Sequence, residues 1–219
     1  MQAITPEVKL VFLCSPGNPT AKAIPLEAIK QIASSPEAKD AIIVVDEAYV
    51  DFSSKGSAVS ILWENPNVVV LQTLSKAFGL AAIRCGFCLG APDVIQLMNN
   101  VKAPYNINVM TSKMALSAFD NIAVLEGHIK TTLEQRTTVA AELAKLDFVV
   151  EVFPSDANFL LVRLTDKALK VYKTMADGGV VVRFRGNENH CNECLRITIG
   201  TPEENKTMLE RIQKVYSSL

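Results

Sequence analysis

Short apolar runs alternate with amphipathic segments through the first half of the chain. Each run has the length of a strand that is buried on both faces of a sheet. The segment Pro25 to Ser34 has proline in its first turn and apolar residues on one face, which predicts a helix. The predicted strands are Val8 to Leu13, Ala41 to Val45, Val68 to Leu71 and Arg84 to Gly90. Strands and helices in this order predict an α/β fold with a mainly parallel sheet.

The second half of the chain has a different pattern. Residues 106–146 have helical periodicity, with a break near Asp120 and Asn121. The remaining predicted elements are strands within 149–164, a helix over 166–177, strands over 180–185 and 195–199, and a helix over 202–216. This mixture predicts a smaller α+β domain. We therefore expect a first domain over residues 1–120 and a second over residues 121–219.

The composition narrows the class of protein further. Hydrophobic residues make up 49% of the chain and charged residues 21%, so a large core is expected and disorder is not. The net charge of −1, without a basic block, argues against a nucleic-acid partner. No apolar run reaches the length of a membrane span, and the start MQAITPEVK has no signal-peptide pattern. Five cysteines, mostly in apolar runs, fit a reducing compartment, so we expect a cytoplasmic protein.

Polar side chains follow several of the predicted strands. In mainly parallel α/β sheets, ligands bind beyond the carboxyl ends of the strands. Asn18, Asp46, Tyr49, Ser75 and Lys76 all lie at or just after such ends. We therefore expect one pocket to collect these side chains.

The segment after the third predicted strand carries the clearest candidate chemistry. Thr73 and Ser75 supply hydroxyls beside the amine of Lys76, and the guanidinium of Arg84 follows. These donors suit a phosphorylated ligand. A lysine just past a buried strand is also placed to form a Schiff base, because desolvation lowers the pKa of an amine. The alternative is an ordinary polar turn whose charges are solvated.

The other strand-end residues also have two interpretations each. Asp46 follows four aliphatic residues, so it either caps a backbone amide or faces a cationic ring nitrogen, as pyridoxal enzymes require. Tyr49 either hydrogen-bonds a phenolic oxygen of a ligand or is an ordinary half-buried tyrosine. Asn18 either takes part in the site or stabilises its own turn.

Two arginines stand out in the predicted second domain. Arg183 and Arg196 each lie in a predicted strand. They are either surface charges or a clamp for an anionic substrate, because a guanidinium binds carboxylate or phosphate in a bidentate manner.

The cysteines raise the question of a metal site. Cys85 and Cys88 form one CxxC pair, and Cys191 and Cys194 form a second beside His190. The first pair lies in a predicted strand, where residues three apart point to opposite faces. A single CxxC in a loop is weak evidence, so no metal site is expected.

These residues belong to a longer pattern. The matching segments are CSPGNPT at 14–20, VVDEAYVDF at 44–52, TLSKAFGLAAIRCGF at 73–87, VKAPYNIN at 101–108 and CLRITIGTPEEN at 194–205. With these segments the chain resembles the fold-type I pyridoxal-phosphate aminotransferases, and among them the histidinol-phosphate aminotransferases. The resemblance implies part of the large domain of that fold, with its mainly parallel sheet, followed by a smaller α+β C-terminal domain.

The resemblance also implies roles for the candidate residues. Lys76 would bind pyridoxal 5′-phosphate as a Schiff base and then act as the acid and base of the proton transfer. Asp46 would pair with the ring nitrogen, and Asn18 and Tyr49 with the phenolic oxygen. The remaining implied contacts are Thr73, Ser75 and Arg84 with the cofactor phosphate, and Arg183 and Arg196 with substrate anions. The implied substrates are L-histidinol phosphate and the 2-oxoglutarate/glutamate pair, and the implied assembly is a homodimer.

The chain departs from the family pattern in two places. Ala21 stands where the family usually has glycine, and the chain begins well inside the large domain of the family. We therefore expect part of the phosphate-binding loop and the aromatic residue that stacks on the cofactor to be missing. Two alternatives stay open: a related enzyme, such as a threonine-phosphate decarboxylase or an aromatic aminotransferase, or a non-catalytic fragment.

Overall fold

The computed structural model describes residues 3–219, which form two compact units. The first unit contains the residues up to Gly17 together with Ala23–Glu126. The second contains Asn18–Lys22 together with Gly127–Leu219, so the chain enters the second unit twice. Each unit has its own sheet and its own apolar core. The domain ranges expected from the sequence stay a prediction.

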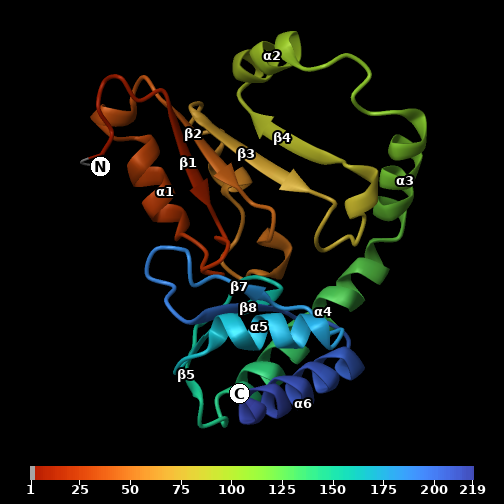
Figure 1. Cartoon of the computed structure of the whole chain (residues 1–219). Coiled ribbons are helices and arrows are strands. Elements are labelled where there is room, and N and C mark those ends of the chain that lie inside the picture. The colour runs from red at the N-terminus through yellow and green to blue at the C-terminus, as the bar shows by residue number, and fades with distance from the viewer. Residues whose placement is uncertain (1–2) are drawn as a thin grey trace. The chain divides into compact units, whose positions relative to one another are not determined.

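The first unit is built on a four-stranded sheet with the strand order β1-β2-β3-β4 (Figure 1). The strands are β1 (Leu10–Cys14), β2 (Ile42–Asp46), β3 (Val68–Thr73) and β4 (Gly86–Gly90). β1, β2 and β3 are parallel, whereas β4 runs antiparallel to β3. A parallel neighbour needs a long crossover connection, usually a helix. The connection from β3 to β4 contains only the 3₁₀ turn Ala81–Ile83 and returns directly.

Helix α1 (Leu26–Ala33) covers one face of this sheet. Ile29 is buried on the inner side of the helix. Alternation along the strands places Ile43 and Val45 of β2 in one cluster with Val68 and Val70 of β3. The predicted helix and three predicted strands therefore meet in one core.

The helices after β4 differ in part from the sequence-based expectation. They are α2 (Pro92–Val101), α3 (Val109–Asp120) and α4 (Ile122–Leu143). The expected break near Asp120 and Asn121 separates α3 from α4. Helix α2 is not among the elements expected from the sequence, although Val94, Ile95, Leu97 and Met98 follow helical spacing. Within the described residues, no helix combines the length and apolar composition needed to cross a membrane.

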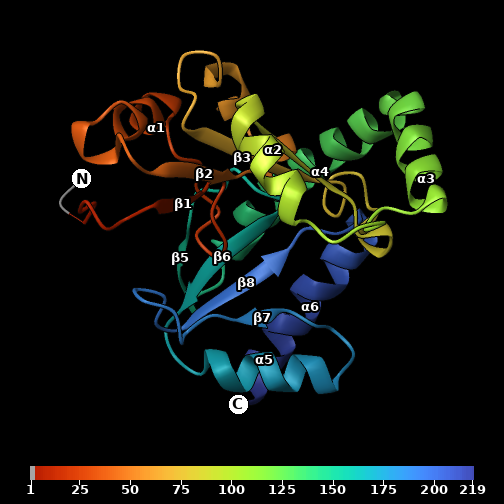
Figure 2. The same ribbon diagram turned by 90° about the horizontal axis from the view of Figure 1, so that it is seen from above.

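The second unit has an antiparallel sheet with the order β5-β6-β8-β7. Its elements are β5 (Val149–Val152), β6 (Phe159–Leu164), α5 (Ala168–Asp177), β7 (Arg183–Phe184), β8 (Cys194–Thr198) and α6 (Pro202–Ser218). Leu160 and Val162 of β6 pack with Leu195 and Ile197 of β8 against α5, α6 and the end of α4. Figure 2 shows α5 and α6 beside this sheet. One face of the sheet is thus covered by helices, and the other carries arginine side chains.

Candidate active site

Lys76 lies on a tight turn that directly follows β3. Leu74 is 1% exposed and Ala77 is also buried, so the turn is anchored on both sides of the lysine. The amide of Gly79 donates to the carbonyl oxygen of Lys76 at 3.0 Å, and Gly79 has a φ of 68°, which favours glycine. Lys76 itself is exposed. The buried neighbours therefore fix the backbone of the turn, while the Lys76 side chain is exposed.

The hydroxyl groups predicted beside Lys76 lie together. The Thr73 hydroxyl contacts Ser75 Oγ at 2.9 Å, and the Ser75 amide donates to Thr73 Oγ1 at 3.1 Å. Arg84 precedes β4 with a left-handed φ of 53°, and its Nη1 donates to the Ala81 carbonyl oxygen at 2.9 Å. The predicted strand over Arg84 to Gly90 therefore begins two residues later, at Gly86, because Arg84 ends the 3₁₀ turn; the Arg84 side chain is exposed.

Asp46 and Tyr49 lie at the carboxyl end of the neighbouring strand. Asp46 is the last residue of β2, and β2 pairs with β3 so that Asp46 lies opposite Leu71. The Lys76 Nζ atom is 5.3 Å from the centroid of the Tyr49 ring. Asp46 Oδ1 accepts a hydrogen bond from the Ala48 amide at 3.1 Å, so the amide-capping interpretation holds for this oxygen. Within the described residues, Oδ2 of Asp46 accepts no hydrogen bond.

The predicted anion-binding residues lie in the second unit. Arg183 of β7 and Arg196 of β8 are direct cross-strand partners, so their side chains share one face of the sheet. The Arg196 guanidinium carbon is 5.1 Å from the centroid of the Phe159 ring. Arg196 Nη1 donates to Asn18 Oδ1 at 2.9 Å. The structure thus brings Asn18 into contact with Arg196, whereas the pocket expected to join Asn18 with Lys76 stays a prediction.

The loop that carries Asn18 has an unusual backbone. The peptide bonds Ser15–Pro16 and Asn18–Pro19 are cis. Ala21, the residue that replaces the expected glycine, is fully buried and has a φ of 61°. This is the left-handed region, in which glycine has no steric penalty. The loop therefore keeps the conformation that favours glycine although it carries alanine.

Glu47 is a site-adjacent residue that the sequence analysis did not single out. Its side chain is 3% exposed and accepts hydrogen bonds from Ser57, Ala58 and Gln72. The sequence does contain a signal for this residue: two consecutive acidic residues, Asp46 and Glu47, follow an aliphatic run, and consecutive side chains point in different directions. Charge alone does not reveal that the second carboxylate points into the protein.

The cysteine pairs have few possible partners for a metal. Cys191 and Cys194 are buried as free thiols and pack with Leu161 and Phe153. Burial raises the pKa of the Cys194 thiol, which disfavours the thiolate that a metal requires. Within the part of the chain that the structure describes, no three His, Cys, Asp or Glu side chains form a metal-binding group.

The fold and these residues define a class of protein. A mainly parallel sheet carries a lysine beyond one strand end and a carboxylate beyond the next, and a separate antiparallel unit carries two arginines. Residues 1–212 match the family described as aminotransferase class I and II. The chain belongs to this family.

Individual members of the family are similar to this chain over almost its whole length. The chain is 40% identical to the histidinol-phosphate aminotransferase of Cytophaga hutchinsonii, with 99% of this chain and 61% of that protein covered. It is 44% identical to the histidinol-phosphate aminotransferase of Schizosaccharomyces pombe, with 95% of this chain and 58% of that protein covered. The chain therefore spans about three fifths of the length of the curated relatives that it matches.

Solved structures support the fold. The histidinol-phosphate aminotransferase of Clostridium acetobutylicum superposes with a TM-score of 0.90 over 97% of this chain and 65% of that chain, at 24% identity. The histidinol-phosphate aminotransferase of Sinorhizobium meliloti, solved in complex with pyridoxal-5′-phosphate, gives a TM-score of 0.84 at 25% identity. That comparison covers 95% of this chain and 57% of the other. The expected type I aminotransferase fold is confirmed.

Proposed function

We propose that the chain forms the lysine-bearing part of a pyridoxal-phosphate-dependent aminotransferase. The observation that carries this proposal is the position of Lys76, which lies on the anchored turn after β3, with its amine near Tyr49. The family match over residues 1–212 supports it. The relative in complex with pyridoxal-5′-phosphate supports the choice of cofactor.

The side chains of the first unit fit this cofactor chemically. An aldehyde needs an amine, a pyridinium nitrogen needs a carboxylate and a phosphate needs donors. Lys76, Asp46 and the Thr73–Ser75 hydroxyl pair supply these groups, and Arg84 adds a guanidinium. The bound cofactor would supply an electron sink for the substrate carbon. We therefore assign pyridoxal 5′-phosphate as the cofactor.

Each residue then has a defined task. The Lys76 amine would hold the cofactor through its aldehyde carbon, and once free it would act as the base that takes a proton from the substrate α-carbon and as the acid that gives the proton back. The Asp46 carboxylate, whose Oδ1 accepts from the Ala48 amide, would keep a proton on the ring nitrogen. Tyr49 and Asn18 would each hydrogen-bond the phenolic oxygen of the ring.

For the substrates, we propose L-histidinol phosphate and the 2-oxoglutarate/glutamate pair, in histidine biosynthesis. All of these molecules carry anionic groups, and Arg183 and Arg196 place two guanidinium groups on one sheet face. The names of the relatives support the same choice. Arg196 would bind the α-carboxylate of the dicarboxylate, and Arg183 would assist with substrate phosphate or carboxylate. The cytoplasmic location and the homodimer expected above stay predictions.

The first test of the proposed function is chemical labelling of Lys76. The chain is incubated with pyridoxal 5′-phosphate, reduced with borohydride and mapped by peptide mass spectrometry. We expect the pyridoxyl group on Lys76, and we expect Lys76→Ala to lose both the label and the visible absorption band. The exposed residues Lys102 and Lys113 are internal controls, and a label on either of them in place of Lys76 would overturn the assignment.

A further inference from the structure

Glu47 is a buried acid that is held by three donors. The Ser57 hydroxyl donates to Oε2 at 2.6 Å, the Ala58 amide to Oε1 at 2.6 Å and the Gln72 side-chain amide to Oε2 at 2.9 Å. A carboxylate only accepts hydrogen bonds, so Gln72 must present its nitrogen. Both carboxylate oxygens are thus engaged.

These donors come from two other segments of the chain. Ser57 and Ala58 begin the 3₁₀ turn Ala58–Ile61, and Gln72 lies in β3, next to Thr73. Glu47 itself follows Asp46, and its carbonyl oxygen accepts from the Val50 amide at 3.1 Å, which closes the turn that contains Tyr49. The amide of Glu47 donates to the Leu71 carbonyl oxygen at 2.8 Å. One residue therefore links the segment with Asp46 and Tyr49 to the strand that leads to Lys76.

The desolvation cost of burying the Glu47 carboxylate indicates that its hydrogen bonds have a structural role. Burial of a charged carboxylate is unfavourable unless the group is paired or fully hydrogen-bonded. Here short, charge-assisted hydrogen bonds offset that cost. If the Glu47 carboxylate is removed, its buried donors lose their acceptor. Each unpaired buried donor then costs more free energy than an average hydrogen bond contributes.

We propose that Glu47 is a positioning residue for the cofactor site. Its carboxylate fixes the end of β2 against the end of β3, which sets the distance between the Asp46 carboxylate and the Lys76 amine. Glu47 acts through its neighbours and does not contact the cofactor. This inference rests on the proposed function, because it assumes that Asp46 and Lys76 hold one ligand.

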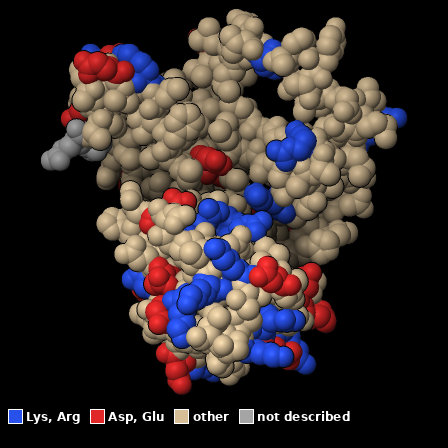
Figure 3. Space-filling model, in the orientation of Figure 1, with Lys and Arg blue, Asp and Glu red and all other residues tan. Residues whose placement is uncertain are grey.

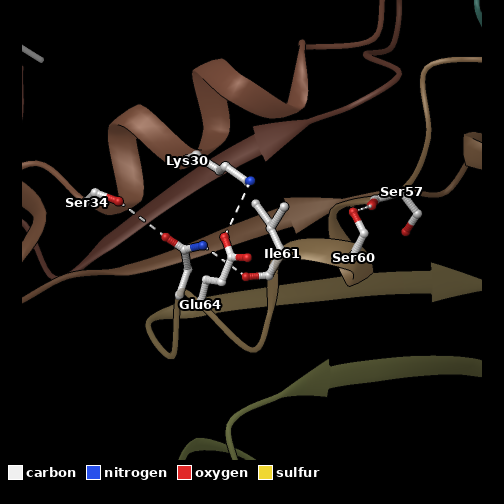
Figure 4. Close-up of polar contacts among 7 residues, drawn as sticks. Lys30, Ser34, Ser57, Ser60, Ile61 and Glu64 are labelled. Atoms are coloured by element: carbon white, nitrogen blue, oxygen red, sulfur yellow. Dashed lines mark hydrogen bonds and ion pairs between the residues drawn. The ribbon is translucent and has the colours of Figure 1, made fainter.

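A second buried polar network in the same unit provides a matched comparison. Asn65 is 6% exposed, its Nδ2 donates to the Ile61 carbonyl oxygen at 2.9 Å, and its Oδ1 accepts from Ser34 at 3.3 Å. Figure 4 shows this network together with the ion pair between Lys30 and Glu64. Asn65 lies before the start of β3, at the end of the strand away from Lys76. A change there removes buried hydrogen bonds of the unit but none of the three that Glu47 accepts.

The structure suggests a swap that separates positioning from simple stability. Glu47→Gln replaces one acceptor with a donor that faces the Gln72 nitrogen, so the link between the two strand ends is broken. Adding Gln72→Glu exchanges the two groups. In the double variant, the new side-chain amide at position 47 accepts from the Ala58 amide and donates to the new carboxylate at position 72. That carboxylate also accepts from the Ser57 hydroxyl. The double variant therefore keeps one charge and the full set of hydrogen bonds.

The experiment has two readouts on the whole chain. Hydrogen exchange without cofactor reports the local order of residues 46–49 and 71–76, and titration with pyridoxal 5′-phosphate reports affinity through the visible absorption band. We expect Glu47→Gln to speed local exchange and to weaken cofactor binding on the order of tenfold, the effect of one lost charge-assisted hydrogen bond. We expect the double variant to restore both, and Asn65→Leu to change neither while it lowers the unfolding midpoint.

The outcomes are distinguishable. The positioning role would be overturned if Glu47→Gln left hydrogen exchange and cofactor affinity unchanged. It would also be overturned if the double variant restored neither. Equal losses in Asn65→Leu would show that Glu47 acts only through stability. If Glu47→Gln does not fold, Ser57→Ala removes a single donor and should shift both readouts in the same direction by less. If the proposed function is wrong, the visible absorption band will persist in Lys76→Ala. The hydrogen-exchange measurement uses no cofactor, so it tests Glu47 independently of that result.

Discussion

Arg196 shows how the neighbours of one side chain constrain its chemistry. The Phe159 ring supports one face of its guanidinium, and the amide oxygen of Asn18 accepts from Nη1. Arg183 lies directly across the strand pair. Like charges in this position repel each other unless an anion lies between them. The planar guanidinium is thus oriented and placed where a carboxylate would lower the repulsion.

Replacing Arg196 with lysine tests this arrangement. Lysine keeps the charge but loses the bidentate geometry. We expect the affinity for 2-oxoglutarate to fall by one to two orders of magnitude, corresponding to about 1.5–3 kcal/mol for a hydrogen bond to a charged group. The cofactor absorption band should be unchanged. If that band disappears together with 2-oxoglutarate binding, Arg196 stabilises the fold rather than binding the carboxylate.

Arg163 offers a matched control for this substitution. It lies on the same sheet face, opposite Cys194, and its guanidinium carbon is also 5.1 Å from an aromatic centroid, that of Phe153. Arg163→Lys should leave 2-oxoglutarate affinity near the parental value. An equal loss in both variants would indicate a general effect on the sheet.

Asp46 provides a second prediction at this scale. Asp46→Asn keeps an oxygen that can accept from the Ala48 amide, so the fold should be nearly intact. It removes the charge that holds a proton on the ring nitrogen. We expect transamination by the complete enzyme to slow by about a hundredfold or more, as when one preorganised electrostatic group is removed. Unchanged turnover would mean that Asp46 only caps its turn.

At the scale of elements, the sequence predicted the presence of the strands better than their ends. The apolar run Val68 to Leu71 is a strand because both of its faces are buried, and this pattern is visible in the sequence. The strand expected over residues 180–185 shrinks to Arg183–Phe184, because the Val180 amide instead donates to the Met175 carbonyl at the end of α5. That contact depends on how the chain leaves a helix, which periodicity does not encode.

In the candidate site, the sequence grouped residues that are close along the chain but not contacts between distant residues. Lys76, Ser75 and Thr73 are local in sequence, so a strand followed by a polar turn was enough to group them. The contact between Asn18 and Arg196 joins residues 178 positions apart. No local pattern predicts such a pair, although the resemblance gave both residues roles in one site. The burial of Glu47 depends on Gln72 and Ser57, which local sequence patterns do not connect to it either.

Helix α6 gives a prediction at this scale. Thr201 caps the helix: its Oγ1 accepts from the Glu204 amide at 3.2 Å, and Glu204 Oε2 accepts from the Thr201 amide at 2.8 Å. Thr201→Ala should destabilise the chain by about 1 kcal/mol, measured by urea unfolding followed by circular dichroism. Thr207→Ala on the same helix removes only an exposed hydroxyl and should change stability by less than about 0.5 kcal/mol. Equal effects would contradict the capping role.

At the scale of the whole molecule, the first unit exposes much apolar surface. Within the described residues, β1 and β4 are the edges of the first sheet and each has one partner strand. Leu10 is 56% exposed, Phe12 is 64% exposed and Trp63 is 98% exposed. Figure 3 shows few charged residues over this unit, whereas both signs are interspersed over the second. Further exposed apolar side chains on α2 and α3 are Leu97, Val101, Val109, Met110 and Leu116.

Such surfaces are rarely left open in a stable monomer, because unpaired strand edges and large apolar patches associate with other chains. The curated relatives are longer than this chain, which spans about three fifths of their length. We therefore predict that the 219-residue chain, expressed alone, self-associates and has little transaminase activity. Light scattering over a range of protein concentrations measures the first property, and an assay with L-histidinol phosphate and 2-oxoglutarate measures the second.

A charge placed on the open edge strand makes this prediction specific. Phe12→Lys puts a solvated cation on β1, which natural edge strands use against association, so it should shift the chain towards smaller species. Val181→Lys changes a residue of similar exposure in the second unit and should leave the size distribution unchanged. A chain that is monomeric at every concentration and has ordinary activity would show that the first unit needs no further partner. The interpretation of this chain as part of a larger enzyme would then be wrong.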